Sequence, residues 1–261
     1  MEQLSVAQRY GEQWSAGAAV RAEHYAGMSR PAWLHVLAAL EIGAGTRLLD
    51  VGCGSGEFCA LAADRGAATA GIDAAPGMIE LARRRLPAAD LRIGTLERLP
   101  WPAAGFDVVT GFNAFQFAPD LVAALAEAGR VTRPGGHVVV CNWGPVPQCE
   151  LVGVVRRIEH LRPEPPLVPR RPIGEPGELE ELARAAGLRP DSATLVEVPY
   201  APPDRATMLR GLLAAGNVAP AVAHSGSAAV RAALTAAAAP FRRPDGSYLF
   251  RNTFRCVISA R

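Results

Sequence analysis

The chain has 261 residues, of which 49% are hydrophobic, and its formal net charge at pH 7 is +2. This size and composition predict a globular protein with one large domain, or one domain with an added cap. Such a small net charge does not favour nucleic-acid binding, so nucleic acid is not an expected partner.

Residues 1–45 have a helical pattern and carry aromatic side chains at Tyr10, Trp14, Tyr25 and Trp33. These aromatics either pack against a core or form a wall of a ligand site, and both interpretations stay open. The first 14 residues include charges and lack an apolar centre, which is not the pattern of a signal peptide. No apolar run approaches the roughly 20 residues of a membrane span. We therefore expect a cytoplasmic protein with no membrane partner.

Between Thr46 and Trp143 short apolar runs alternate with helical patterns, which predicts a parallel α/β sheet covered on both faces. Asp120 stands where it would cap a helix, and "RPGG" at 133–136 predicts a turn. We expect strands at 47–51, 68–73, 90–94, 106–112 and 137–143, with helices at 57–66, 76–86 and 120–131.

Beyond Trp143 the pattern changes. Residues 144–176 are proline-rich and form either an insertion over the sheet or a disordered loop. A helix is expected at 178–187 and a strand at 193–200. Two further helical patterns lie between 202 and 240, separated by "HSGS", and the alternation at 248–259 predicts a long final strand.

The five cysteines are scattered and include no C-x-x-C pair. This pattern predicts neither a disulfide framework nor a zinc site, and small buried core residues are expected instead. The five are Cys53, Cys59, Cys141, Cys149 and Cys256.

The stretch "LLDVGCGSGEF" at 48–58 is an apolar strand that ends at Asp50 and leads into glycines at 52, 54 and 56. Such glycines tolerate positive φ and let a ligand approach the backbone. A dinucleotide fingerprint starting at Gly52 would need glycine at position 57, where Glu57 stands instead. A carboxylate in the first turn of a helix repels a diphosphate, whereas Asp50 suits an ammonium group. The turn therefore favours a cationic cofactor tail over a nicotinamide dinucleotide.

Asp73 ends the second strand. An acidic side chain at this place accepts hydrogen bonds from both hydroxyls of an adenosine ribose, in nicotinamide and sulfonium cofactors alike. The other interpretation is that Asp73 only caps the helix that begins near Pro76.

Four stretches then occur in order: "LLDVGCGSGEF", "GIDAAPGMIELARRR", "LERLPWPAAGFDVVTGF" and "AGRVTRPGGHVVV". Together they resemble the class I S-adenosylmethionine-dependent methyltransferases, especially the small-molecule branch similar to ubiquinone/menaquinone-type enzymes. The resemblance covers the core of the chain and not its ends. It implies a Rossmann-like sheet of about seven strands, mostly parallel with an antiparallel last strand and helices on both faces. The implied cofactor is S-adenosyl-L-methionine, with S-adenosyl-L-homocysteine as product and no metal.

The resemblance also implies roles at matching positions. Asp50 and the backbone of Gly52, Cys53 and Gly54 line the methionine part of the cofactor, and Asp73 holds the ribose. Adenine is flanked by Ala74 and Met78, and the methyl donor is bordered by Gly111 and Phe112. Asn113, Phe115, Gln116 and Phe117 follow and face the substrate. Tyr10 and Trp14 are candidates to close over the methionine end.

After the third strand the family commonly shows glycine-aspartate-alanine-glutamate, with the aspartate taking the adenine amino group. This chain reads "GTLE" from Gly94 to Glu97. Thr95 stands at the aspartate position, so that contact is weakened or passes to the backbone of Leu96. The difference bears on cofactor affinity and not on cofactor identity. The asparagine-proline-proline-aromatic motif of enzymes that methylate exocyclic or amide nitrogens is absent, which disfavours nucleic-acid bases and glutamine side chains as substrates.

An amine acceptor needs little assistance once neutral, whereas a hydroxyl or carbon acid usually needs a general base. His24, in the N-terminal segment, and His224, between the two late helical patterns, are the candidates for that base. His137 lies in an expected strand and is interpreted as structural.

We expect residues 1–45 to form an N-terminal helical segment and residues 46–261 the Rossmann-like domain, with cap insertions at about 144–176 and 202–243. Ligands of open α/β sheets bind at the carboxyl ends of the strands, so the cap would cover that edge. The expected function is methyl transfer to an oxygen, nitrogen or carbon atom of a small organic acceptor, for example in specialised metabolism. Two alternatives stay open: an S-adenosylmethionine-binding protein that transfers no methyl group (an isomerase, cyclase or non-catalytic subunit), and a nicotinamide oxidoreductase.

Overall fold

The computed structural model describes residues 5–169, 171 and 173–261, without the side chains of residues 25 and 26. The side chain of Tyr25 therefore lies outside the described residues, as do residues 170 and 172 of the expected insertion. Within the described residues, no helix is both long and apolar enough to cross a membrane.

The described strands form one seven-stranded sheet with the order β3-β2-β1-β4-β5-β7-β6. The strand β7 runs antiparallel to both β5 and β6, and the other neighbouring pairs are parallel. This confirms the fold class implied by the resemblance. The strands are β1 (Arg47–Val51), β2 (Ala68–Asp73), β3 (Asp90–Ile93), β4 (Phe106–Phe112), β5 (Thr132–Trp143), β6 (Arg189–Glu197) and β7 (Thr253–Ala260).

Helices cover both faces of the sheet because the central strands are apolar on both sides. In β1, Leu48 packs into a cluster with helices α2 and α3, and Leu49 packs into a second cluster with α5 and α7. The helices are α1 (Val6–Ser15), α2 (Ala18–Ala39), α3 (Glu57–Ala63), α4 (Pro76–Arg85), α5 (Leu121–Val131), α6 (Glu150–Arg156), α7 (Glu178–Ala185), α8 (Arg205–Leu213) and α9 (Ala219–Ala238). As predicted, the Asp120 carboxylate caps α5 by accepting a hydrogen bond from the backbone N–H of Ala123, at 3.0 Å.

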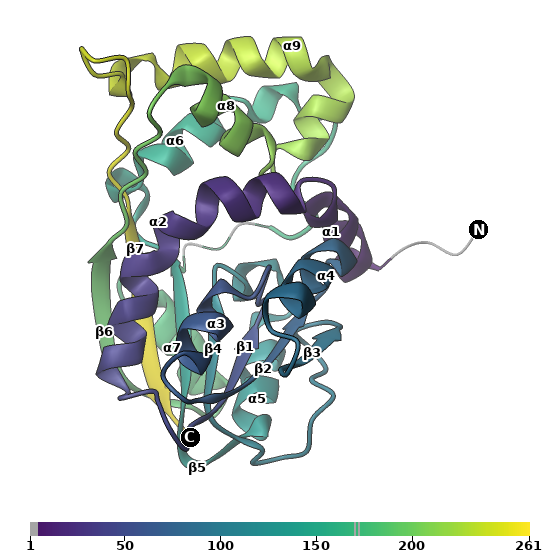
Figure 1. Cartoon of the computed structure of the whole chain (residues 1–261), viewed down its shortest axis with the longest axis vertical. Coiled ribbons are helices and arrows are strands. Elements are labelled where there is room, and N and C mark those ends of the chain that lie inside the picture. The colour runs from purple at the N-terminus through teal and green to yellow at the C-terminus, as the bar shows by residue number, and fades with distance from the viewer. Residues whose placement is uncertain (1–4, 170, 172) are drawn as a thin grey trace.

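Three of these helices, α6, α8 and α9, lie together beyond α2, away from the sheet (Figure 1). Helix α8 packs against α2, and α9 packs against α6 and α8. Helices from two separate connections, one after β5 and one between β6 and β7, therefore gather at one end of the molecule.

The last strand is shorter than the predicted 248–259, because regular pairing begins only at Thr253. Tyr248 and Phe250 form isolated bridges instead, with Arg242 and Tyr200. Backbone hydrogen bonds continue here in irregular form, from the Val198 N–H to the Asn252 carbonyl and in both directions between Tyr200 and Phe250. The Asn252 side-chain oxygen accepts from the backbone N–H of Leu151.

Strand β5 starts earlier than predicted, since the "RPGG" segment belongs to it. Thr132 pairs with Phe106, and pairing resumes in shifted register at His137. The expected turn is therefore an irregularity within the strand, where Gly135 has a φ of 71°.

The two helical patterns predicted between 202 and 240 divide at a different place. "HSGS" produces a kink inside α9, where Gly226 has φ 79° and ψ 152°. The break between helices falls earlier, between Leu213 and Ala219. Gly216 lies in that break against the ring of Trp14, and a Cβ atom on it would come within 2.5 Å of the indole.

The cysteine prediction is wrong in part. Cys141 and Cys256 are direct neighbours on β5 and β7, and they form a disulfide with a Cα–Cα distance of 4.1 Å. Spacing along the chain could not reveal this pair, because 115 residues separate the two cysteines. Cys53, Cys59 and Cys149 are buried free thiols, as predicted.

Candidate functional site

Two cavities meet at the carboxyl edge of the parallel strands, where ligands of open α/β sheets bind. The larger cavity has a volume of about 450 Å³ and the smaller one about 130 Å³. They share several wall residues, so one elongated ligand can extend from one cavity into the other. The shared residues are Tyr10, Trp14, Arg21, Gly52, Gly54, Met78, Phe112, Asn113 and Phe117.

The glycine turn after β1 requires glycine for two separate reasons. Gly52, Gly54 and Gly56 have φ values of 72°, 54° and 79°, a region that side chains with a Cβ atom rarely adopt. At Gly52, a Cβ atom would also come within 2.4 Å of the Ala114 methyl group. A Cβ on Gly54 would meet nothing within 4 Å, because that position faces open space. The backbone at Gly54 is therefore exposed to a ligand in both cavities.

Asp73 organises the turn that carries Gly54. One carboxylate oxygen accepts from the Gly54 N–H at 2.9 Å, and the other accepts from the Ala75 N–H at 2.8 Å. Burial raises the pKa of Asp73, although these backbone donors and the charge of Arg21 oppose the shift. Each oxygen keeps a further lone pair, and Asp73 lines the smaller cavity. The Asp73 carboxylate therefore binds the Ala75 N–H, as a helix cap would, and also presents lone pairs to a ligand in the smaller cavity.

Asp50 ends β1 as a nearly fully buried carboxyl group, 3% exposed, in the wall of the larger cavity. One of its oxygens accepts a hydrogen bond of 2.7 Å from the Thr110 hydroxyl. Burial raises the pKa of Asp50 to about 7; the Thr110 hydrogen bond lowers it, and the nearby Asp73 and Glu57 charges raise it further. Such a group is stabilised in its charged form by a cation placed in the cavity.

Glu57 begins α3 and also lines the larger cavity. Its carboxylate accepts from the Ser55 hydroxyl at 2.6 Å and lies 3.1 Å from the Arg85 guanidinium. Arg85 thus offsets part of the negative charge that the sequence places beside the turn.

The smaller cavity brings together the residues predicted around adenosine. Ala74 and Met78 line it together with the segment after β3. Thr95 in that segment forms an isolated β-bridge with Arg98. The lining from this segment is Gly94, Thr95, Leu96 and Glu97.

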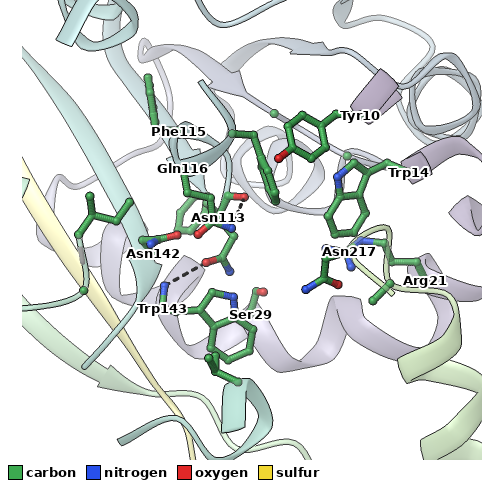
Figure 2. Close-up of a pocket in the computed structure, with 18 of the residues that line it drawn as sticks. Tyr10, Trp14, Arg21, Ser29, Asn113, Phe115, Gln116, Asn142, Trp143 and Asn217 are labelled. Carbon is green, nitrogen blue, oxygen red and sulfur yellow. Dashed lines mark hydrogen bonds between the residues drawn. The ribbon is translucent and has the colours of Figure 1, made fainter. Parts of the chain in front are cut away.

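After β4 the chain turns sharply at Asn113, which has a left-handed φ of 52°. Its backbone N–H donates to the Cys141 carbonyl at 2.7 Å, and its side-chain oxygen accepts from the Trp143 N–H at 3.1 Å. Gln116 donates from its side chain to the Asn113 carbonyl at 3.3 Å. Figure 2 shows these amides grouped beside Phe115 in the wall of the larger cavity.

Gly111 is the one predicted cofactor position that lines neither cavity among the described residues. A Cβ atom there would come within 2.5 Å of the Phe115 ring, so the glycine makes room for that ring. Phe115 is 1% exposed and supports the wall from behind.

Aromatic rings from the N-terminal helices close the cavities. Tyr10 and Trp14 contact Phe117, with ring centroids 4.9 and 5.7 Å apart. The Tyr10 hydroxyl accepts from the Val168 N–H at 3.3 Å, which joins α1 to the insertion. Trp33 also lines the larger cavity, so these three aromatics form part of a cavity wall.

Several lining residues stand at positions that no sequence motif marks. Arg21 on α2 lines both cavities, with its guanidinium 4.1 Å from the centre of the Trp14 ring. Asn142, at the end of β5, is 5% exposed, and its side-chain oxygen has no hydrogen-bond partner among the described residues. Ser29 and Asn217 complete this polar lining, as Figure 2 shows. Only the fold brings these positions together.

His24 and His224 line neither cavity in the described part of the chain. The Nε2 atom of His24 lies 3.8 Å from the Glu23 carboxylate and forms no hydrogen bond with the described residues. His137, interpreted as structural, lies on β5 at 4.0 Å from Asp191. The described residues also include no cluster of three or more His, Cys, Asp or Glu side chains placed to hold a metal ion.

Comparison with known proteins identifies the fold. A family profile described as "Methyltransferase domain" matches residues 49–140. The structure of the YcgJ protein from Bacillus subtilis superposes with a TM-score of 0.58 at 21% identity, over 88% of this chain and 97% of that one. At this identity the likeness concerns the fold alone.

Two curated relatives align directly with the sequence. The malonyl-[acyl-carrier protein] O-methyltransferase of Serratia marcescens is 43% identical over 95 residues, which are 36% of this chain and 37% of that enzyme's own length. The demethylmenaquinone methyltransferase of Deinococcus radiodurans is 34% identical over 164 residues, covering 55% of this chain and 68% of that enzyme. With the glycine turn, Asp73 and the sheet topology, these matches place the chain in the class I S-adenosylmethionine-dependent methyltransferase family.

Proposed function

We propose that this protein transfers a methyl group from S-adenosylmethionine to an oxygen, nitrogen or carbon atom of a small organic acceptor. The observation that supports this most is the shared wall of the two cavities. The smaller cavity contains Asp73 and the 94–97 segment, and the larger one contains Asp50 and the exposed backbone of the glycine turn.

The residues present fit the cofactor that the family implies. Gly54 presents backbone without a side chain, and Asp73 offers free lone pairs for the ribose hydroxyls. Asp50 supplies a buried carboxyl group for the ammonium of the methionine part, and Arg21, which lines both cavities, supplies a cation for its carboxylate. Tyr10 and Trp14 then exclude water from the methionine end.

When bound, the cofactor supplies a methyl group on a sulfonium, which leaves to an in-line nucleophile while the carbon–sulfur electron pair stays on sulfur. The protein's task is to hold the acceptor atom about 3 Å from that methyl group with its lone pair aligned. Asn113, Gln116 and Asn142 are placed to orient an acceptor by hydrogen bonds. The described lining of the larger cavity includes no histidine. We therefore propose that an acceptor that must lose a proton does so without a histidine base.

We propose a small acceptor rather than a nucleic acid, in a cytoplasmic setting. A volume of about 450 Å³ falls within the roughly 300–1,000 Å³ typical of small-molecule sites. We also propose that residues 1–45, 144–176 and 202–243 together act as the cap over this site.

Binding and transfer can be measured separately. We expect S-adenosylhomocysteine to raise the melting temperature of the purified protein and NADH to have no effect. Incubation with methyl-labelled S-adenosylmethionine and a panel of small phenols, amines and carbon acids should place label on an acceptor. Stabilisation by NADH alone would contradict the proposal. Tight cofactor binding without any labelled product, even from small molecules that stay bound through purification, would favour the non-transferring alternative.

Replacing Thr95 by aspartate is expected to strengthen S-adenosylmethionine binding by about threefold to tenfold. The new carboxylate stands where the family's aspartate takes the adenine amino group, and Thr95 already lines the smaller cavity. Thr95→Asn, similar in size and without the charge, is the matched control and should give a smaller gain. Isothermal titration measures both, and unchanged or weaker binding in Thr95→Asp would show that adenine does not lie beside position 95.

A further inference from the structure

Charged side chains of the insertion are distributed unevenly about the larger cavity. Residues 144–176 include four acidic side chains, Glu150, Glu159, Glu164 and Glu175, of which only Glu175 lines the cavity. Of the described arginines in this segment, Arg156, Arg162 and Arg171 line it and Arg157 does not. The insertion therefore presents mainly positive charge to the cavity.

Two of these cations, Arg156 and Arg171, have no ionic partner among the residues that the structure describes. The acidic residues away from the insertion that share the cavity, Asp50 and Glu57, lie beside the glycine turn, where the cofactor is proposed to bind. Glu175 is the one described acidic residue that the insertion adds to this lining, against three arginines, so the insertion side of the cavity keeps a net positive charge.

The rest of the acceptor end is uncharged. It offers amide and hydroxyl groups from Asn113, Gln116, Asn142 and Ser29, and the rings of Trp33 and Trp143. A ligand that fills this space with an aromatic or aliphatic body would reach the arginines with one end. Arginine binds carboxylate and phosphate oxygens in a planar, two-pronged geometry, which makes it selective for such groups.

We propose that the acceptor substrate is a small organic anion, whose carboxylate or phosphate group is bound by Arg156 and Arg171 while its reacting atom lies beside Asn113 and Gln116. This inference rests on the proposed function, because only a methyltransferase has an acceptor. The preference for an anion is a property of the cavity and can be measured by itself. It deepens the assignment from a small organic molecule to a negatively charged one.

Matched ligand pairs test the charge preference directly. The protein, saturated with S-adenosylhomocysteine, is titrated with 1-naphthoate against 1-naphthamide, and with 1-naphthyl phosphate against 1-naphthol. We expect each anion to bind about tenfold or more tightly than its neutral partner, and the preference to shrink as salt is raised. The pair with the larger ratio identifies carboxylate or phosphate as the preferred group.

Variants assign the preference to the two arginines. Arg156→Gln combined with Arg171→Gln should bring the anion and neutral ligands to within about twofold. Arg157→Gln removes one positive charge from the neighbouring exposed position, outside the cavity lining, and should leave the ratio unchanged. Equal binding within each pair, no detectable binding of either anion, or a ratio that survives the double substitution would each overturn the proposal. If S-adenosylhomocysteine does not bind, the proposed function fails, and the same ligand pairs on the unloaded protein still decide the anion preference.

Discussion

Replacing Asp73 by alanine is expected to weaken S-adenosylhomocysteine binding more than tenfold. The substitution removes the proposed acceptors for two ribose hydroxyls, and a hydrogen bond to a charged group contributes about 1.5–3 kcal/mol. It also releases the Gly54 N–H, which the carboxylate holds at 2.9 Å, so the turn beside the cofactor loosens as well. Isothermal titration gives the change in affinity, and circular dichroism checks that the fold persists.

A ligand pair separates the lost ribose contact from a loosened turn. Wild-type protein should prefer adenosine to 2′,3′-dideoxyadenosine, and Asp73→Ala should lose that preference, since only the carboxylate distinguishes the two ligands. Asp120→Ala serves as the matched control, because it removes an aspartate cap from α5 that lines neither cavity. A preference for adenosine that survives in Asp73→Ala would mean that the ribose binds elsewhere.

The affinity for S-adenosylhomocysteine is expected to rise from pH 5 to about pH 7 and then to level off. Asp50 has a pKa raised to about 7 by burial, so it is mostly protonated below that value in the free protein. A cationic ammonium in the cavity favours the ionised carboxylate, so binding below pH 7 expels a proton. The dissociation constant should then fall by up to about tenfold for each pH unit. Titration in buffers of different ionisation enthalpy measures the released proton.

Variants of Asp50 and of Thr110, its hydrogen-bond partner, show whether Asp50 is the group that titrates. Asp50→Asn should flatten the profile between pH 5 and 7 and weaken binding at pH 8. Thr110→Val removes the 2.7 Å hydrogen bond that lowers the Asp50 pKa, so the levelling-off should move to higher pH. A profile that keeps its slope in Asp50→Asn would assign the proton to a different group.

The raised pKa of Asp50 also makes the stability of the free protein depend on pH. Because the folded pKa lies above the unfolded value of 3.8, the native state holds a proton that the unfolded chain has lost. The contribution of Asp50 to stability is therefore full below about pH 4 and falls as pH rises through about 7. Asp50→Asn should stabilise the unliganded protein at pH 8 by a few kcal/mol, and by much less at pH 4. Denaturant unfolding at both values measures the difference.

The central strands and the glycine turn could be predicted because their signals are local. The bounds of β1, β2 and β4 agree with the apolar runs at 47–51, 68–73 and 106–112. A strand buried on both faces needs a continuous apolar run, and a turn with positive φ needs glycine, so both requirements are written in consecutive residues. The start of β7 at Thr253 could not be predicted, because residues 248–252 pair irregularly with the segment 198–202, which only the fold brings beside them.

The sequence by itself determined the fold class, the cofactor family and the positions of Asp50, Asp73 and the three glycines. Tertiary structure decided what lines the rest of the larger cavity. It pairs Cys141 with Cys256, leaves His24 and His224 outside both cavity walls, and brings Arg156 and Arg171 to the larger cavity. Cofactor motifs lie on short loops after adjacent strands, so their spacing is readable along the chain. The rest of the larger cavity, where the acceptor is proposed to bind, is assembled from segments more than a hundred residues apart, and no local pattern records which of their faces will meet.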